Sequence, residues 1–160
     1  MHAQAFGLSI AEENLIPFKQ VLEYFLQDFS FNQSYKVDLI CNAKNIPIND
    51  VLEIAELKPH WGQGVPESLV AIEELKVTLD KLKLMSPDKK PTLKFIGDGI
   101  DFIKFKSSED EYERLIDLIG EGYIKINLVG TCNKNEWNGK ITPQIIIKEY
   151  EIVEVMPYDF

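Results

Sequence analysis

The sequence is short of cysteine, histidine and long apolar runs, and each shortage excludes a class of protein. Its two cysteines, Cys41 and Cys132, lie far apart with no CxxC pair, which argues against a disulfide scaffold or a cysteine-based zinc site. No apolar stretch of about 18 residues occurs, and the N-terminus lacks the pattern of a secretory signal. We therefore expect a chain of the reducing cytoplasm that makes no contact with a membrane.

Catalytic motifs are also scarce. The only histidines are His2 and His60, and no HExxH, GxSxG or carboxylate–histidine cluster with metal-ligand spacing occurs. The segment 61–64 contains a GxG but lacks both the GxGxxG spacing and a preceding strand, so we interpret it as a plain turn. The sequence thus predicts no catalytic residues and no metal site within this chain, and an intact small enzyme is disfavoured.

What is present is enough apolar material for a core, together with an uneven charge. Apolar residues make up 45% of the 160 residues, and the net charge is −9. Taken alone, that charge argues against a nucleic-acid binder, because phosphate neutralisation needs Lys and Arg. However, 13 of the 17 basic residues lie in 68–160. The average charge therefore does not describe every face of that part.

The first part of the chain alternates helix and strand. Apolar spacing from Leu15 to Phe29 predicts a helix over 10–28, although Pro17 requires either a kink or a regular start near Leu15. A strand over 35–41 and a short helix over 48–57 follow. Two Gly and two Pro between 58 and 67 then break all periodicity, so we place a domain boundary there.

After residue 68 the pattern becomes mainly β. We expect strands over 69–73, 76–85, 92–96, 100–106, 123–132 and 141–155, with one helix over 109–119. Asn138-Gly139 between two β-rich runs is a strong hairpin pattern. The acidic run 109–113 suits a helix N-terminus better than a cation site. The whole predicts an α+β chain: a partial α/β piece followed by an OB-like Greek-key barrel of five to six strands with one inserted helix. A β-sandwich is the structural alternative.

Lysines and aromatic residues alternate with apolar ones along these strands. In 123–129 the residues Tyr123, Lys125 and Asn127 are expected to face outward, opposite Ile124, Ile126 and Leu128. Gln144, Ile146, Lys148 and Tyr150 would share one face of the last strand, as would Phe102 and Lys104 on an earlier one. Lysine beside an aromatic ring is typical of single-strand binding platforms, where bases stack and ammonium groups meet phosphates. By pattern alone an ordinary solvated sheet face is the stronger interpretation.

Trp137 lies beside the predicted hairpin turn and has two possible roles. A tryptophan at a hairpin tip can stack a base. It can also fold back over the barrel end and bury its ring, with the indole N–H bonded to a carbonyl. We favour the packing role, and we keep Trp137 among the candidate nucleic-acid contacts.

Three segments resemble a known family. The first, His2-Ala-Gln-Ala-Phe-Gly-Leu-Ser-Ile, is similar to the GGHxxAAG-Leu-Ser-Ile segment in the DHH-associated domain of DHH-family phosphoesterases. The second, 57–68, is similar to the PFGxGNPxPxF linker of RecJ-like exonucleases. The third, 129–140 followed by Pro143-Gln-Ile-Ile-Ile-Lys-Glu-Tyr, resembles the end of their OB domain. The three occur in the family's order and cover nearly the whole chain. Departures include His60-Trp61 for Phe-Gly, Val65 for Asn, and Glu149 for Asp.

The resemblance implies the C-terminal part of a RecJ-like exonuclease that degrades single strands from the 5′ end. It implies a DHH-associated piece over 1–60, a linker over 61–67 and the OB-like barrel over 68–160. The catalytic DHH domain, with Mn or Mg, is expected upstream, so this chain alone should be catalytically silent. His2 matches the family's GGH histidine near the cleft, and without the facing domain we expect it to be frayed.

From these observations we expect the chain to hold or thread single-stranded DNA for an upstream nuclease domain that acts in DNA repair and recombination. The candidate contacts are four lysines for phosphates and two aromatic residues for stacking: Lys94, Lys104, Lys125 and Lys148, with Tyr150 and Trp137. The alternative is a protein-interaction module that docks onto its own catalytic domain or onto a replication or repair protein. An incomplete first domain would also expose apolar surface and favour a homodimer.

Overall fold

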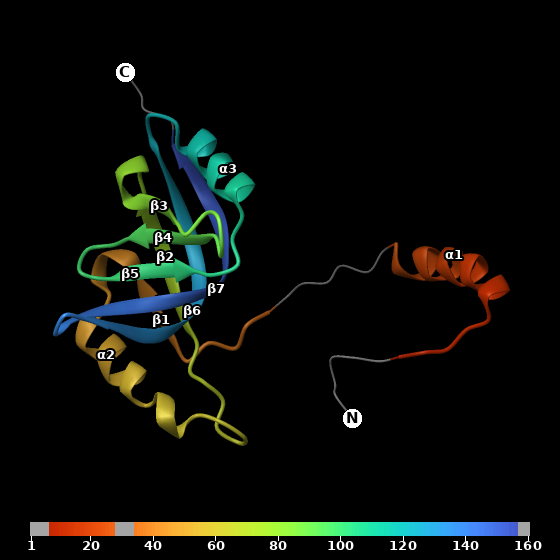
Figure 1. The fold of residues 1–160 in the computed structure, drawn as a ribbon, viewed down its shortest axis with the longest axis horizontal. Coiled ribbons are helices and arrows are strands. Elements are labelled where there is room, and N and C mark those ends of the chain that lie inside the picture. The colour runs from red at the N-terminus through yellow and green to blue at the C-terminus, as the bar shows by residue number, and fades with distance from the viewer. Residues whose placement is uncertain (1–6, 28–33, 157–160) are drawn as a thin grey trace. The chain divides into compact units, whose positions relative to one another are not determined.

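A computed structural model describes residues 7–27 and 34–156 of the chain (Figure 1). Contacts divide the chain into two units, Met1–Ser34 and Tyr35–Phe160. The two units are described separately. No helix among the described residues has both the length and the apolar character needed to cross a bilayer.

The described residues of the first unit form one short 3-10 turn and one helix. The turn η1 spans Glu12–Asn14 and leads directly into α1, Leu15–Leu26. Pro17 is therefore the third residue of α1, where the missing N–H would have had no intrahelical partner. This confirms the regular start at Leu15. No described residue of α1 is buried, and its apolar side chains include Ile16 at 69% and Phe25 at 73% exposure.

The second unit is built on one seven-stranded sheet. Its strands are β1 (Leu39–Asn42), β2 (Val70–Val77), β3 (Leu82–Met85), β4 (Thr92–Ile96), β5 (Asp101–Lys104), β6 (Tyr123–Trp137) and β7 (Lys140–Met156). Two helices, α2 (Ile48–Glu56) and α3 (Glu109–Ile119), complete it with three 3-10 turns, η2 (Ala43–Asn45), η3 (Lys58–His60) and η4 (Leu79–Lys81). The strands pair in the order β1-β2-β6-β7-β5-β4-β3.

The pairing closes the sheet into a barrel. β2 pairs with β6, and β3 pairs with β4, yet only η4 separates β2 from β3 along the chain. β2 and β3 are therefore the two halves of one bent strand. β2 pairs with β6 at one end of the series β6-β7-β5-β4, and β3 pairs with β4 at the other end, which closes the barrel. β5 and β7 are parallel, and α3 lies between β5 and β6 in the sequence. This is the OB arrangement, so the predicted α+β fold with an OB-like barrel and one inserted helix is confirmed.

The first strand and helix of the second unit belong to the same body as the barrel. β1 extends the sheet by parallel pairing with β2, with Leu39 opposite Val70. α2 buries Val51 and Ala55 in the barrel's core cluster. The sequence placed a division at 61–67, whereas the contacts place it between 34 and 35. The Gly/Pro segment is the loop between η3 and β2, and it lies inside the second unit.

The core fills the barrel and continues beneath the helices. Phe95, Phe102 and Ile145 lie fully inside, and Ile124, Ile126 and Leu128 face the core as their alternation predicts. Leu115 and Ile119 of α3 pack against the same cluster. Ser108 caps α3 by accepting a hydrogen bond from the Glu111 N–H at 3.1 Å, and the acidic run forms the first turn of the helix. The core holds the strand faces and loops in fixed positions.

Candidate nucleic-acid interface

Three of the four predicted phosphate-binding lysines are held by carboxylates. Lys94 Nζ lies 2.6 Å from the Asp101 carboxylate, and Lys104 Nζ lies 3.2 Å from that of Glu111. Lys125 Nζ donates to Glu154 at 2.7 Å, and this hydrogen bond raises the pKa of Lys125 above its ordinary value. A phosphate approaching any of these ammonium groups competes with a carboxylate already in place.

Lys104 and Tyr150 lie together at the end of the barrel beside α3. The Tyr150 hydroxyl donates to Glu111 at 2.8 Å, and Lys104 Nζ lies 5.8 Å from the Tyr150 ring centre. The ring meets the core residue Phe95 edge-on, with centroids 5.8 Å apart. Burial, followed by the hydrogen bond to Glu111, raises the pKa of Tyr150 strongly. The geometry therefore ties Tyr150 to the helix and the core.

A β-bulge explains why Tyr150 does not share the face of Gln144 as the alternation predicted. Gly130 pairs with Ile147 and Val129 pairs with Glu149, so Lys148 is the extra residue. One extra residue reverses the side on which every later side chain points. Gln144 is accordingly outside the barrel, while Tyr150 lies on the core side. Lys148 itself is exposed and makes no ion pair with the described residues.

Trp137 and His2 complete the predicted set. Trp137 is 73% exposed at the end of β6, so the expectation that its ring folds back and is buried is wrong. Asn138 and Gly139 both have positive φ, 49° and 75°, as a two-residue hairpin turn of this type requires. This turn carries Trp137 and Lys140 away from the barrel. His2 lies outside the described residues.

The structure shows a second group of candidate contacts, three lysines and one phenylalanine, on the loops that flank β4 and β5. Lys89 and Lys90 lie in the β3–β4 loop, and Phe105 and Lys106 lie in the β5–α3 loop; we call these four the loop rim. The Ser107 N–H donates to the Pro91 carbonyl at 3.1 Å and so joins the two loops. Phe105 is 56% exposed, and within the part of the chain that the structure describes the three lysines make no ion pair.

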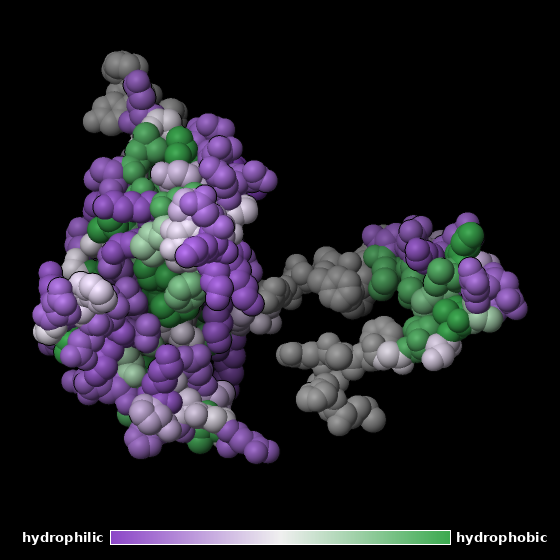
Figure 2. All heavy atoms as spheres, in the orientation of Figure 1, coloured by the Kyte–Doolittle hydropathy of each residue, from purple (hydrophilic) through white to green (hydrophobic). Residues whose placement is uncertain are grey.

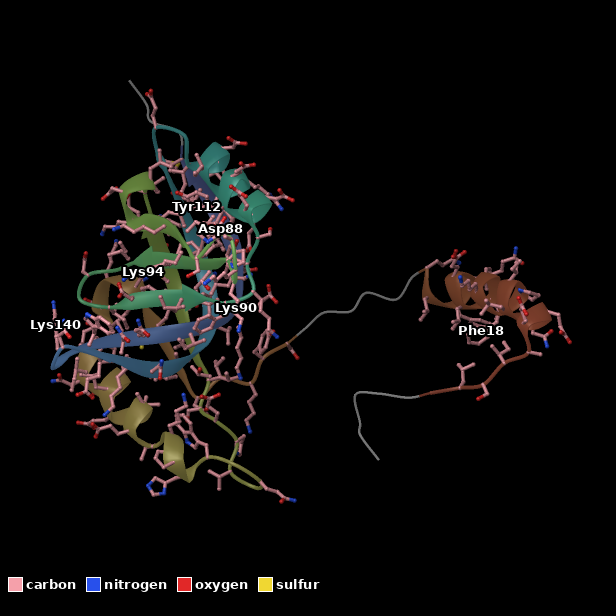
Figure 3. The ribbon with its side chains drawn as sticks, viewed as in Figure 1. Phe18, Asp88, Lys90, Lys94, Tyr112 and Lys140 are labelled. Carbon is pink, nitrogen blue, oxygen red and sulfur yellow. The ribbon has the colours of Figure 1, made fainter. Side chains whose placement is uncertain are left out.

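The loop rim and the hairpin tip, Trp137 to Lys140, flank the outer face of β4 and β5. Figure 3 shows Lys94 between Lys90 and Lys140 on this side of the barrel. Lys83 of β3, exposed and without an ion pair to a described residue, pairs directly with Lys94. Figure 2 shows a small apolar area over these strands within a largely hydrophilic surface. In OB folds the ligand-binding face consists of the second and third barrel strands and two loops. Here these strands are β4 and β5, and the loops are the β3–β4 loop and the β6–β7 hairpin.

The sequence analysis missed the loop rim because it looked for lysines on strands. The β3–β4 loop and the β6–β7 hairpin are marked in the sequence by their turn residues, Ser86-Pro87-Asp88 and Asn138-Gly139. Once an OB barrel is expected, the loops at those turns are the known flanks of the binding face. The loop residues could therefore have been selected from the sequence by fold position.

The described residues do not form a metal site. Over 7–27 and 34–156, no group of three or more His, Cys, Asp or Glu side chains is placed to hold an ion. Cys132 is buried and its pKa is raised to about 11, chiefly by burial, so the thiol stays protonated at neutral pH. Nothing in this part of the chain fits the divalent metal that the family resemblance implies.

The barrel order, the helix between β5 and β6 and the flanking loops define a domain of the OB-fold class. The model of the RecJ OB domain family matches residues 37–149, which is most of the chain. The chain therefore belongs to the RecJ OB domain family. This range begins before β1, so the family's own domain also includes β1 and α2.

Two relatives and one solved structure, each longer than this chain, match it over part of their own length. It is 33% identical over 153 residues to a protein from the SPbeta prophage of Bacillus subtilis, named as the single-strand DNA-specific exonuclease YorK; the match covers 95% of this chain and 26% of that protein. It is 24% identical to RecJ of Bacillus subtilis, covering 99% of this chain and 20% of that one. RecJ of Thermus thermophilus, solved with Mn²⁺, superposes with a TM-score of 0.57 at 17% identity over 94% of this chain and 21% of its own. The chain thus spans about a quarter of the relative that it matches at 33% identity.

Proposed function

We propose that this domain holds single-stranded DNA for a RecJ-like exonuclease, and that the strand crosses the outer face of β4 and β5. The observation that supports this most directly is the position of the unpaired lysines. Figure 3 shows Lys90 on one side of Lys94 and Lys140 on the other, and Lys89 and Lys106 lie on the two loops that the Ser107–Pro91 hydrogen bond joins. Ammonium groups without carboxylate partners are free to replace the counterions of a phosphate backbone.

Two exposed rings suit the same role. Phe105 stands on the loop rim and Trp137 on the hairpin tip, at 56% and 73% exposure. Base–aromatic stacking contributes about 1–3 kcal/mol per base and tolerates any sequence. Rings flanked by lysines give affinity without sequence preference, which is what a nuclease needs from the part that holds its substrate.

Hydrolysis belongs to another part of such an enzyme in this proposal. The described residues offer no metal site, so the Mn- or Mg-dependent step would take place in a DHH domain. We propose that the role of this domain is to hold the strand while that domain acts on its 5′ end. By itself the chain is expected to bind DNA without degrading it.

The test is a binding measurement with charge reversal on the loop rim. Fluorescence anisotropy of a labelled mixed-sequence single strand is followed for the chain and for Lys89→Glu/Lys90→Glu at several salt concentrations. We expect the variant to bind at least about tenfold more weakly, and the slope of log affinity against log salt to fall by about 0.7 for each lost phosphate contact. Circular dichroism confirms that both proteins are folded.

A matched control separates the loop rim from net charge. Lys36→Glu/Lys58→Glu makes the same change in charge at two exposed positions away from the barrel face. This control should lose much less affinity than the rim variant. Equal losses in both variants would show that only overall charge matters, and a salt-independent affinity would rule out phosphate contacts altogether.

The exposed face of α1 supports a second function, docking onto a protein. Val21, Tyr24 and Phe25 are 52–73% exposed, and exposed apolar patches on soluble proteins mark interaction sites. The upstream catalytic part of the same enzyme is the partner we propose for it, with a replication or repair protein as the alternative. Because apolar burial responds weakly to salt, Phe25→Glu should abolish that association at any ionic strength while leaving DNA binding by the barrel unchanged.

A further inference from the structure

A basic hollow lies on the outer surface of β2 and β6, and none of the loop-rim residues lines it. Its volume is about 610 Å³, and its walls come from η2, β2, η4, the β4–β5 turn and the start of β6. Four lysines border it, together with two carboxylates and one aromatic ring: Lys44, Lys76, Lys81, Lys125, Glu74, Asp98 and Tyr123. The proposed DNA-binding face uses none of these side chains.

Two of the lysines are directly opposite one another. Lys76 of β2 pairs with Lys125 of β6 in the antiparallel register. Like charges at directly opposed positions destabilise a sheet unless something neutralises them. Lys125 is held by Glu154 at 2.7 Å, whereas Lys76 has no carboxylate partner among the described residues and lies 4.0 Å from the centre of the Tyr123 ring. One positive charge of the pair therefore remains available.

The wall beside this pair is held in an unusual backbone conformation. Glu74 has φ of 57°, which is rare for a residue other than glycine, at the bulge between Ile72 and Leu75. Its N–H donates to Asn127 at 3.0 Å, and its carboxylate accepts from the Asn42 side chain at 2.8 Å. Such conformations persist only where the surroundings fix them, and they concentrate at functional sites. Here the contacts hold the Glu74 carboxylate against Asn42, and Lys125 Nζ lies 3.9 Å from that carboxylate.

The remaining two lysines differ in their freedom. Lys81 reaches Asp98 at 3.1 Å, but the Asp98 side chain is almost fully exposed, so this pair is weak and easily replaced. Lys44 is exposed and makes no ion pair with the described residues. Lys44 and Lys76 are thus two uncompensated cations on one hollow, and Lys81 can join them.

We propose that this hollow binds a phosphate group, which Lys44 and Lys76 hold with help from Lys81. A phosphate offers several acceptor oxygens to lysine donors, and charge-assisted hydrogen bonds of this type are stronger than neutral ones. The phosphate can belong to a nucleic-acid strand or be free in solution. The first source rests on the proposed DNA-holding function, whereas the second does not depend on it.

The experiment is a titration with inorganic phosphate, followed by NMR of the backbone amides of Leu75, Gly97 and Tyr123 at constant ionic strength. We expect saturable shifts that sodium chloride does not produce, and at least about a tenfold loss of phosphate affinity in Lys44→Ala/Lys76→Ala. Lys36→Ala/Lys58→Ala, which removes the same charge, should respond like the unchanged chain. Shifts that chloride reproduces, or a Lys44/Lys76 variant that titrates normally, would overturn the proposal.

Oligonucleotides of two lengths distinguish the sources. If the phosphate belongs to a strand, Lys44→Ala/Lys76→Ala weakens the binding of a long oligonucleotide and leaves that of a short one unchanged. If the phosphate is free, the variant loses only the response to inorganic phosphate. Lys89→Glu/Lys90→Glu should keep that response in either case, so a failure of the proposed DNA-binding face remains visible separately.

Discussion

Three lysines of the strands and two of the β3–β4 loop differ in what lies beside them. Lys94, Lys104 and Lys125 stand on strands, half-buried, each within 2.6–3.2 Å of a carboxylate. Lys89 and Lys90 stand on a loop, exposed and without such a partner among the described residues. Each of these lysines carries the same charge, yet of the two sets only the second offers it to a ligand.

This difference teaches that the number of lysines on a face does not measure its attraction for phosphate. With a net charge of −9, the chain can hold an anion only where lysines escape its own carboxylates. Cross-strand neighbours in a sheet supply such carboxylates at fixed distances, as Glu154 does for Lys125. The lysines of the loop rim extend beyond that reach, and strand lysines without such a neighbour, such as Lys83 and Lys148, also stay uncompensated among the described residues.

The largest effect is expected from an aromatic residue on the loop side of this comparison. Trp137→Ala removes a ring that is 73% exposed and packs against nothing that the structure records. If the ring stacks a base, single-strand affinity should fall by between about fivefold and about 150-fold while the melting temperature stays the same. Anisotropy and thermal unfolding measure the two quantities.

The other tryptophan provides the control. Trp61 lies half-buried in the loop after η3, away from the proposed face. Trp61→Ala should leave DNA affinity unchanged and lower the melting temperature. A loss of stability without loss of affinity in Trp137→Ala would restore a packing role for the hairpin ring.

A smaller effect should follow from turning a paired lysine into a free one. Asp101→Asn removes the carboxylate 2.6 Å from Lys94, on the face that the strand is proposed to cross. Single-strand affinity should rise about two- to fivefold, as expected for one added phosphate contact, at a cost in stability of no more than about 1 kcal/mol. Titration at two salt concentrations should show a steeper salt dependence than for the unchanged chain.

Asp117→Asn makes the same change in charge at an exposed position of α3 that has no recorded partner. Its affinity should rise less than that of Asp101→Asn. If both variants gain equally, the effect is one of overall charge, and the distinction between paired and free lysines has no consequence for binding.

Much of the fold could be predicted because periodicity and turn chemistry act locally. The helix over 109–119 and the hairpin at Asn138-Gly139 were predicted at the positions where they occur. The pairing of β1 with β2 was not, because a parallel contact between strands some thirty residues apart leaves no local pattern. A surface loop and a domain linker share the same Gly/Pro composition, so residues 61–67 alone could not place the division of the chain.

The candidate site was harder to predict because it depends on side-chain partners. The alternation along β7 placed Tyr150 and Gln144 on one face, and a single bulge at Lys148 separated them. Bulges have no strong sequence pattern, yet each one reverses the sides of all later residues. The carboxylates beside Lys94 and Lys104 come from other segments of the chain, and only the fold brings them together.

The smallest effect concerns Tyr150, on the strand side of the comparison, and appears only at high pH. Burial and the hydrogen bond to Glu111 raise the pKa of Tyr150 above the ordinary value of 10.0. The folded state therefore retains this proton where the unfolded state loses it, so the contribution is fully present below pH 10 and is lost as pH rises toward the folded pKa. Tyr150→Phe should flatten the alkaline decline in unfolding free energy, measured by urea denaturation between neutral pH and pH 11. Its DNA affinity at neutral pH should match that of the unchanged chain, because the hydroxyl is already engaged by Glu111; a clear loss of affinity would return Tyr150 to the DNA-binding face.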